Sequence, residues 1–416
     1  MQKIRDFLQR EQVDKATLLT ILVAALGYFV DIFDLLMFSI VRVQSLKSIG
    51  VPEDQILETG IFLINTQMAG LLVGGIVWGI WGDKLGRISV LFGSILLYSI
   101  ANIANGFVHD VEMYAVFRFI AGVGLAGELG AGVTLASELF PRAWRGLGTT
   151  FIASIGVLGA VFAAFVAEMT DWRTAYIIGG IMGLALLLLR INVRESGLYE
   201  KMAKSAQNVS RGNFLMLLTN GKLFTRYLAV ILVGAPLWGI VGLFITFTPE
   251  FAKDFGMSEM PKAGTAVLAC YAGLFVGDAL SGILSQFLRS RRKAVAICLV
   301  FMSLSIAAYV LAPHETLFEY YSLCFMMGVG AGYWAMFVQM GAEQFGTNIR
   351  ATAATSIPNM VRGFIIPMSG AFHFLIPYTG VTMAGVTVLA VMISLAFLSL
   401  LVLRETFQED LDYVEV

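Results

Sequence analysis

The sequence is poor in charged residues and in the residues that build soluble catalytic or metal sites. Lys, Arg, Asp and Glu make up only 14% of the 416 residues, and the chain has three Cys, three His and nine Pro. The three cysteines all fall in apolar stretches, which indicates neither a disulfide framework nor a metal cluster. With 58% hydrophobic residues, the composition excludes an ordinary soluble domain.

Motifs for catalysis or for an ATP-driven pump are also missing. The sequence has no P-loop, no metal-ligand spacing of His and Cys, and no Ser/His/Asp arrangement on one membrane face. We therefore expect a protein that is not an enzyme, with no cofactor, no bound metal and no nucleic-acid partner.

Long apolar runs dominate the chain, and many reach the roughly 18 residues needed to cross about 30 Å of hydrocarbon. We predict an all-α membrane protein with twelve spans, at 17–44, 58–82, 88–107, 113–138, 148–168, 174–191, 227–248, 263–287, 294–311, 318–341, 353–376 and 381–403. The first 15 residues are polar and amphipathic, so we expect no signal peptide. Most Lys and Arg then share the face of the N-terminus, and the positive-inside rule places both chain ends in the cytoplasm.

Two stretches about half the chain apart resemble each other. Leu71–Arg87 and Leu274–Arg292 each end an apolar run in a basic cluster, and Gly74 aligns with Gly277. This repeat predicts a duplicated membrane protein whose halves share one topology. We expect six-helix bundles at 1–190 and 227–416, joined by a cytoplasmic linker at 191–226.

The connection between spans two and three carries a motif. Gly79-Ile-Trp-Gly-Asp-Lys-Leu-Gly-Arg87 resembles the Gly-x-x-x-Asp-Arg/Lys-x-Gly-Arg-Arg/Lys signature of the major facilitator superfamily. Two glycines permit a tight turn, and the charges can meet a helix end or a carboxylate. In that family such contacts are implied to latch the cytoplasmic side, whereas the alternative is a loop that only sets topology. The predicted latch comprises Gly82, Asp83, Gly86, Arg87, Glu138, Arg145, Glu343 and Arg350.

Span four carries a second resemblance to the same superfamily. Its Arg118-x-x-x-Gly-x-Gly run continues to Glu138-x-x-Pro-x-x-x-Arg-Gly, and Gly127-Glu128 is similar to the metabolite:proton symporter branch. Asp31-Ile-Phe-Asp34 in span one is similar to the Glu-Trp-Phe/Tyr-Asp-Phe of that branch. The resemblance covers nearly the whole chain and implies two pseudo-symmetric six-helix bundles that carry a small solute together with protons.

Charged side chains inside the spans are the candidates for proton coupling, because an ionisable group in a bilayer costs at least about 2.5–3.5 kcal/mol. At 1.5 Å per residue, Asp34 lies roughly 24 Å above the inner edge and Arg118 roughly 8 Å below the outer edge, so the two side chains can pair. Asp31, one turn from Asp34, is expected to tune Asp34, and Glu128 is a second proton-carrier candidate. The alternatives are a permanent ion pair and a hydrogen-bonded structural acid.

Arg362 lies near the middle of span eleven, between Pro358 and Pro367, which should bend or break that helix. A lone Arg facing a cavity suits an anionic substrate group, and the alternative is a pair with Asp278. The predicted substrate-binding residues are Arg362, Asn359, Gln339, Tyr333, Trp334, Trp238 and Gln67.

We therefore expect a proton-coupled symporter for a small anionic or zwitterionic metabolite that works by alternating access. The alternatives are a proton antiporter exporting drugs or siderophores and a transporter-derived sensor or receptor. The expected partners are the substrate, protons and the lipid bilayer. The expected setting is a monomer in a plasma membrane, as in the bacterial inner membrane.

Overall fold

The computed structural model describes residues 15–85, 87–139, 145–190, 214–346 and 349–407, and within these the side chains of a few helical segments are left out. The described residues form helices and no strands. Seven helical segments among them are long and apolar enough to cross a membrane, and Ser89–Asn105 and Ile155–Met169 are shorter apolar helices.

The first half follows the six predicted spans. Its helices are α2 (Lys15–Ser48), α3 (Ile56–Leu85), α4 (Arg87–Asn105), α5 (Val111–Leu139), α6 (Arg145–Met169) and α7 (Trp172–Arg190), with the short 3-10 helix η1 (Glu53–Gln55) before α3. Each predicted boundary lies within a few residues of the observed one. Long apolar runs therefore predicted both the type and the position of these elements.

The second half contains more interruptions than expected. Its elements are α9 (Phe214–Thr219), α10 (Gly221–Gly239), the π-helix η2 (Ile240–Ile245), α11 (Thr248–Asp254), α12 (Ala263–Leu288), α13 (Arg291–Leu311), α14 (Leu317–Ala331), α15 (Trp334–Glu343), α16 (Arg350–Gly363) and α17 (Ile365–Val402). α9 and the start of α10 occupy residues 214–226 of the predicted linker. Its remainder lies outside the described residues.

Breaks divide three of the predicted spans of this half, and a kink separates the last two spans. Span seven is split into α10, η2 and α11, and span ten is split into α14 and α15. Span eleven is interrupted at Phe364, between Pro358 and Pro367, as the prolines predicted. Gly380, with φ of +79°, kinks α17 and separates the last two spans. A side chain is rarely tolerated at that φ, so glycine permits this turn.

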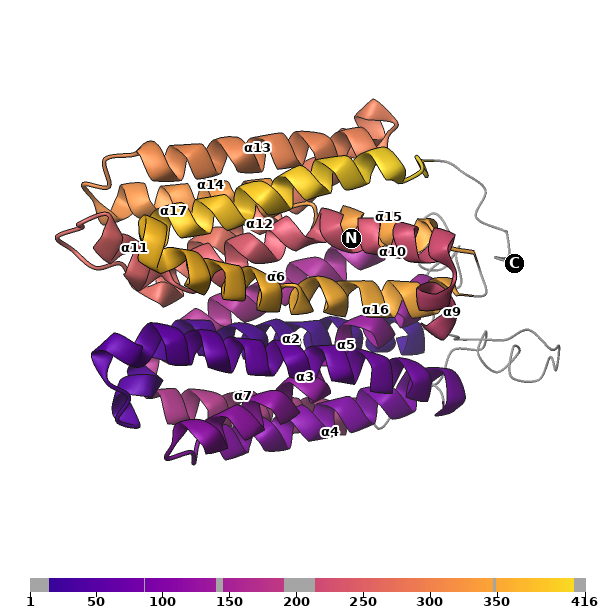
Figure 1. The fold of residues 1–416 in the computed structure, drawn as a ribbon. Coiled ribbons are helices and arrows are strands. Elements are labelled where there is room, and N and C mark those ends of the chain that lie inside the picture. Colours follow the sequence, from indigo (N-terminus) through magenta and orange to yellow (C-terminus); the bar gives the residue numbers. More distant parts are fainter. Residues whose placement is uncertain (1–14, 86, 140–144, 191–213, 347–348, 408–416) are drawn as a thin grey trace, which may run out of the picture.

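The helices lie side by side in two bundles (Figure 1). One contains α2–α5 and α7, and the other contains α10 and α12–α17. We call the end that carries α11 and the α2–α3 connection the outer end, and the opposite end, where α9 lies, the inner end. On the predicted topology the inner end faces the cytoplasm.

The repeat seen in the sequence recurs in the helix packing. A Cβ added at Gly74 of α3 would lie 2.3 Å from the Val123 carbonyl oxygen of α5. A Cβ added at Gly277 of α12 would lie 2.3 Å from the Val329 carbonyl oxygen of α14. Matching glycines thus let matching helix pairs approach closely in both halves.

Candidate functional site

A fully buried ion pair joins the two bundles at the centre of the molecule. The Arg362 Nη2 of α16 lies 3.3 Å from the Asp31 Oδ2 of α2, and both side chains are 0% exposed. Asp31 Oδ1, Arg362 Nε and Arg362 Nη1 are buried without hydrogen-bond partners. The pair is therefore incompletely satisfied, and a ligand with acceptor oxygens could bind the remaining guanidinium donors.

The alternative pairing of Arg362 with Asp278 does not form. Asp278, the expected alternative partner of Arg362, instead accepts a hydrogen bond from the Ala335 backbone N–H at 3.1 Å. It therefore caps the first turn of α15, where the break in span ten exposes unpaired N–H groups and the positive helix end. Asp31 pairs with Arg362 of the other bundle, and its expected tuning of Asp34 from the same helix stays a prediction.

Aromatic and amide side chains border Arg362. Its guanidinium lies 5.5 Å from the centre of the Trp238 ring, and Trp238 packs edge-to-face on Trp334 with centroids 6.4 Å apart. The Trp238 indole N–H is buried without a hydrogen-bond partner. Asn359, on the same helix as Arg362, donates to the Ala126 carbonyl oxygen of α5 at 3.0 Å. Trp238 thus lies beside Arg362, Trp334 packs on Trp238, and Asn359 lies one turn away on α16, but the role of these residues in binding stays a prediction.

Three other predicted substrate-binding residues are engaged elsewhere. The Tyr333 hydroxyl donates to the Val233 carbonyl oxygen at 2.9 Å, which bridges the break in span ten to α10. Gln67 accepts a hydrogen bond from Arg118 inside the first bundle. Gln339 is exposed and donates to Glu343 at 3.0 Å, so it belongs to a cluster at the inner end. Sequence spacing alone could not show these alternative partners.

The expected pair between Asp34 and Arg118 does not form. Arg118 is fully buried, donates to Gln67 and to the Tyr176 hydroxyl, and lies 4.9 Å from the centre of the Phe38 ring. Both carboxyl oxygens of Asp34 are buried without hydrogen-bond partners. The Arg118 guanidinium is instead held by an amide oxygen and by aromatic faces.

The Asp34 side chain packs against Gly179 of α7, where a larger residue would not fit. A Cβ added at Gly179 would lie 2.4 Å from the Asp34 Oδ1. Glu128 is also buried, at 3% exposed, and lies within electrostatic range of Asp31. The structure thus buries three acids, Asp31, Asp34 and Glu128, and Asp31 forms the ion pair with Arg362.

The predicted latch is mostly outside the described side chains. Gly86 is outside the described residues, as are the side chains of Asp83, Arg87, Glu138, Arg145 and Arg350, so the latch stays a prediction. Gly82 was expected in a turn but lies within α3, because the helix continues to Leu85.

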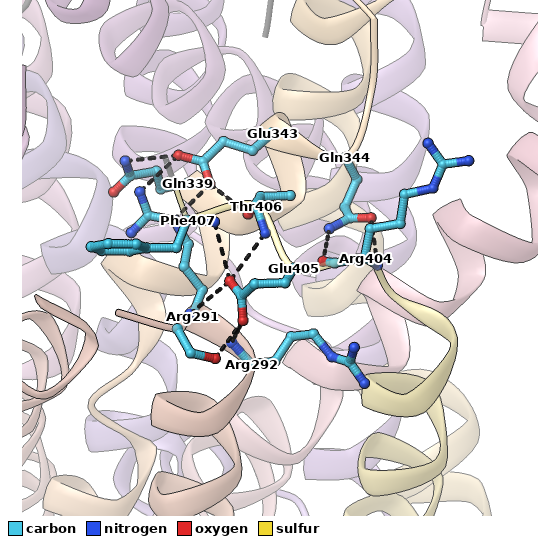
Figure 2. Close-up of polar contacts among 10 residues, drawn as sticks. Arg291, Arg292, Gln339, Glu343, Gln344, Arg404, Glu405, Thr406 and Phe407 are labelled. Atoms are coloured by element: carbon cyan, nitrogen blue, oxygen red, sulfur yellow. Dashed lines mark hydrogen bonds and ion pairs between the residues drawn. The ribbon is translucent and has the colours of Figure 1, made fainter. Parts of the chain in front are cut away.

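Glu343, the one latch residue with a described side chain, belongs to a cluster at the inner end (Figure 2). It accepts two hydrogen bonds from Arg291, at 2.6 and 2.8 Å, and one from the Thr406 hydroxyl at 2.7 Å. These contacts tie the end of α15 to the start of α13 and to the segment after α17. Glu343 therefore stabilises one bundle internally.

Glu405 completes this cluster. Its carboxylate accepts hydrogen bonds from the Ser290 hydroxyl and from the Arg291 and Arg292 backbone N–H groups at the N-terminus of α13. Burial alone would raise the pKa of Glu405, but these bonds and one from the Phe407 N–H hold the pKa below its usual range. An ionised carboxylate at this position also complements the helix dipole.

Sequence reasoning also missed a buried ion pair between the two bundles. Arg42 of α2 and Glu250 of α11 lie 2.6 Å apart near the outer end, and Arg42 is 1% exposed. A basic residue inside the apolar run of span one was the available signal for Arg42.

Comparisons with known proteins agree with this architecture. A putative metabolite transport protein of Haemophilus influenzae is 28% identical over 356 residues, which cover 82% of this chain and 84% of that protein. A probable 4-methylmuconolactone transporter of Cupriavidus pinatubonensis is 25% identical and covers 78% of this chain and 76% of its own. The partially occluded, inward-open structure of the xylose transporter XylE from E. coli superposes with a TM-score of 0.71 at 19% identity, covering 96% of this chain and all of that one.

The structural match gives the fold, and the family profile gives the family. The xylose transporter shows that the chain has the fold of two pseudo-symmetric six-helix bundles, as the repeat predicted. The family profile matches residues 24–370, most of the chain. The protein is therefore a multi-pass membrane protein and belongs to the Major Facilitator Superfamily.

Proposed function

We propose that the protein is a proton-coupled symporter for a small anionic metabolite, with Arg362 as the anion site and Asp31 as the acid that competes for it. The single observation that supports this most is the buried Arg362–Asp31 pair between the two bundles. Both relatives named above are described as transporters, which supports secondary transport of a metabolite.

The coupling follows from the cost of leaving Arg362 uncompensated. Removing one partner of a buried ion pair costs about 3–5 kcal/mol, so the bundles close readily only when an anion faces the guanidinium. In the empty carrier that anion is Asp31. When Asp31 takes up a proton, a carboxylate of the substrate replaces it on Arg362, and a proton and an anion cross together.

Trp238 supports this exchange. The Trp238 face beside the guanidinium stabilises the cation whichever anion is bound.

This proposal reverses the roles expected from the sequence, in which Asp34 carried the proton and Asp31 tuned it. Asp34 has no cation partner and no hydrogen bond in the described structure, and an isolated buried carboxylate is strongly disfavoured. We propose that Asp34 remains protonated through the cycle and acts as a packed polar group of the first bundle.

The test is uptake of a panel of radiolabelled organic acids into proteoliposomes with an imposed pH gradient. Asp31→Asn should abolish accumulation against a gradient and leave exchange of the identified acid at equal concentrations measurable, because exchange never requires the empty carrier to reorient. Asp34→Asn should lower accumulation by less than about threefold, since a neutral amide resembles a protonated acid.

Asp278→Asn is the matched control, because this acid lies in a span but caps a helix. It should retain gradient-driven uptake. Retained accumulation in Asp31→Asn together with loss in Asp34→Asn would transfer the proton role to Asp34. Uptake driven only by a gradient of the opposite sign would instead indicate a proton antiporter.

We also propose that the protein lies in the bacterial inner membrane with both chain ends in the cytoplasm. The distribution of Lys and Arg supports this orientation, and the matched relatives are bacterial.

A further inference from the structure

The bundles are held together at the outer end by a second ion pair, in which both oxygens of the acid take part. Arg42 Nη2 of α2 donates to Glu250 Oε1 and Oε2 at 2.7 and 2.6 Å. The Arg42 side chain is 1% exposed and that of Glu250 is 16% exposed. A contact this short and this dry is electrostatically stronger than a surface pair.

The surroundings of Arg42 fit its side chain closely. It also donates to the carbonyl oxygens of Ile56 and Thr246, both at 3.4 Å, and lies 4.6 Å from the centre of the Phe247 ring. A Cβ added at Gly60 would lie 2.7 Å from the Arg42 Cδ, so the packing of α3 leaves room for this side chain. Arg42 therefore reaches from the first bundle to three features of the second, namely Thr246, Phe247 and Glu250.

The segment that carries Glu250 follows an interruption of the α-helix. Between α10 and α11 the backbone passes through the π-helix η2, and the Thr246 hydroxyl donates to the Val241 carbonyl oxygen within it. The Thr246 hydroxyl also lies 3.0 Å from the Ser39 hydroxyl of α2. π-Helical turns inside α-helices occur frequently at functional sites, and α11 carries Glu250 on the far side of η2.

The contacts on the other side of the central pair are different in kind. Toward the inner end, the bundles meet through the Asn359 amide on the Ala126 carbonyl oxygen, and Asn359 also packs against Gly75. These contacts between described residues are neutral, whereas the outer end is joined by a buried ion pair.

We propose that Arg42 and Glu250 form an ionic lock that closes the outer end, and that α11 swings on η2 to break it when that end opens. In the closed state each charge compensates the other in a dry environment. In the open state water hydrates both groups, so neither charge is left buried without a partner. The lock is thus stable in two arrangements, as a gate requires.

The inference rests on the alternating opening contained in the proposed function, but its test does not need the substrate. Spin labels at Asp54→Cys and Glu315→Cys, which are exposed at the outer ends of the two bundles, report the opening by double electron–electron resonance. The background replaces Cys270, Cys298 and Cys324 with Ser or Ala.

Arg42→Ala and Glu250→Gln should each raise the ratio of long to short distances by at least about tenfold. The double variant Arg42→Glu/Glu250→Arg should return the distribution toward that of the parent, because it restores opposite charges across the same gap. A purely steric role of Arg42 predicts no such rescue.

The chain offers a matched control at the same end. Lys262 and Glu168 also pair across the bundles, at 2.6 Å, but their side chains are 71% and 64% exposed. Exposed pairs are worth at most about 1 kcal/mol, so Glu168→Gln should change the ratio by less than about fivefold.

Distances in Arg42→Ala and Glu250→Gln that match those of the control would overturn the lock. Glu250→Gln keeps the shape of the side chain and carries the test if Arg42→Ala does not fold. If the lock variants show no change in distance but the parent takes up substrate with protons, the lock is wrong and the proposed function stands. If the lock variants do shift the distances but the parent shows no proton-driven uptake, the lock stands and the proposed function is wrong.

Discussion

At the scale of single residues, Arg362 is the group whose chemistry most constrains the substrate. Two of its guanidinium nitrogens are buried without hydrogen-bond partners, and a third contacts Asp31 at 3.3 Å, which is long for a charge-assisted bond. A carboxylate with two coplanar oxygens would satisfy more of these donors than Asp31 does. This geometry favours Arg over Lys, whose ammonium is a compact point charge.

We therefore expect Arg362→Lys to weaken binding of the identified anion by about 1.5–3 kcal/mol, the usual contribution of a hydrogen bond to a charged group. Isothermal titration calorimetry of the purified protein measures this. Arg118→Lys is the comparison, because Arg118 is also fully buried but is bound to Gln67 within one bundle. Equal losses in both variants would argue against a specific role of Arg362 in binding.

The sequence showed which charged residues lie inside the membrane but not which of them meet. Asp31, Asp34, Arg118 and Arg362 were all recognised from their positions in apolar runs, since such residues are rare there. Their pairing depends on how the bundles face each other, and helix rise gives depth without direction. Asp34 and Arg118 share a depth, yet Arg118 points to Gln67 and Tyr176, while Asp31 meets Arg362 of the other half.

At the scale of helices, small residues set the distances between neighbours. α12 shows this at two of its glycines. A Cβ added at Gly273 would lie 2.0 Å from the Phe325 carbonyl oxygen of α14, whereas a Cβ added at Gly282 would meet nothing within 4 Å. Both positions lie in one helix, so they share the same intrinsic preference for alanine.

Gly273→Ala should therefore destabilise the protein by about 1–3 kcal/mol or more, because α14 must move away from α12. Gly282→Ala should be neutral or stabilise by up to about 1 kcal/mol, because alanine favours the helix. Thermal unfolding in detergent, followed by tryptophan fluorescence, measures both. A similar loss in the two variants would show that helix preference, and not close approach, governs these sites.

The breaks in the second half show where helix prediction from a single sequence ends. Pro358 and Pro367 predicted the interruption at Phe364, because proline removes a backbone hydrogen-bond donor from a helix. No proline or charge marks Gly332–Tyr333, and glycine alone is too common here to be informative. This break is stabilised by tertiary contacts, with Asp278 on the new helix end and Tyr333 on the Val233 carbonyl oxygen.

At the scale of the whole molecule, three sets of contacts lie along the boundary between the bundles. Arg42 and Glu250 lie at the outer end, Asp31 and Arg362 at the centre, and Asn359 and Ala126 toward the inner end. A rigid rotation of one bundle about the central pair would separate one end while it compressed the other. The centre is where the exchange of anions takes place, so it can remain in contact throughout.

Labels on the two ends should therefore report opposite movements. Asp54→Cys with Glu315→Cys reports the outer end, and Ser89→Cys with Lys222→Cys, both exposed, reports the inner end. Acidification in the presence of the identified anion should lengthen one distance and shorten the other. With Asp31 protonated and the anion bound to Arg362, the bundles can close at either the outer or the inner end. The Arg362→Ala variant should show no response to the anion, since the anion then has no preferred state to stabilise. Distances that lengthen together at both ends would indicate loosening of the bundles, which is incompatible with rotation about a central ion pair.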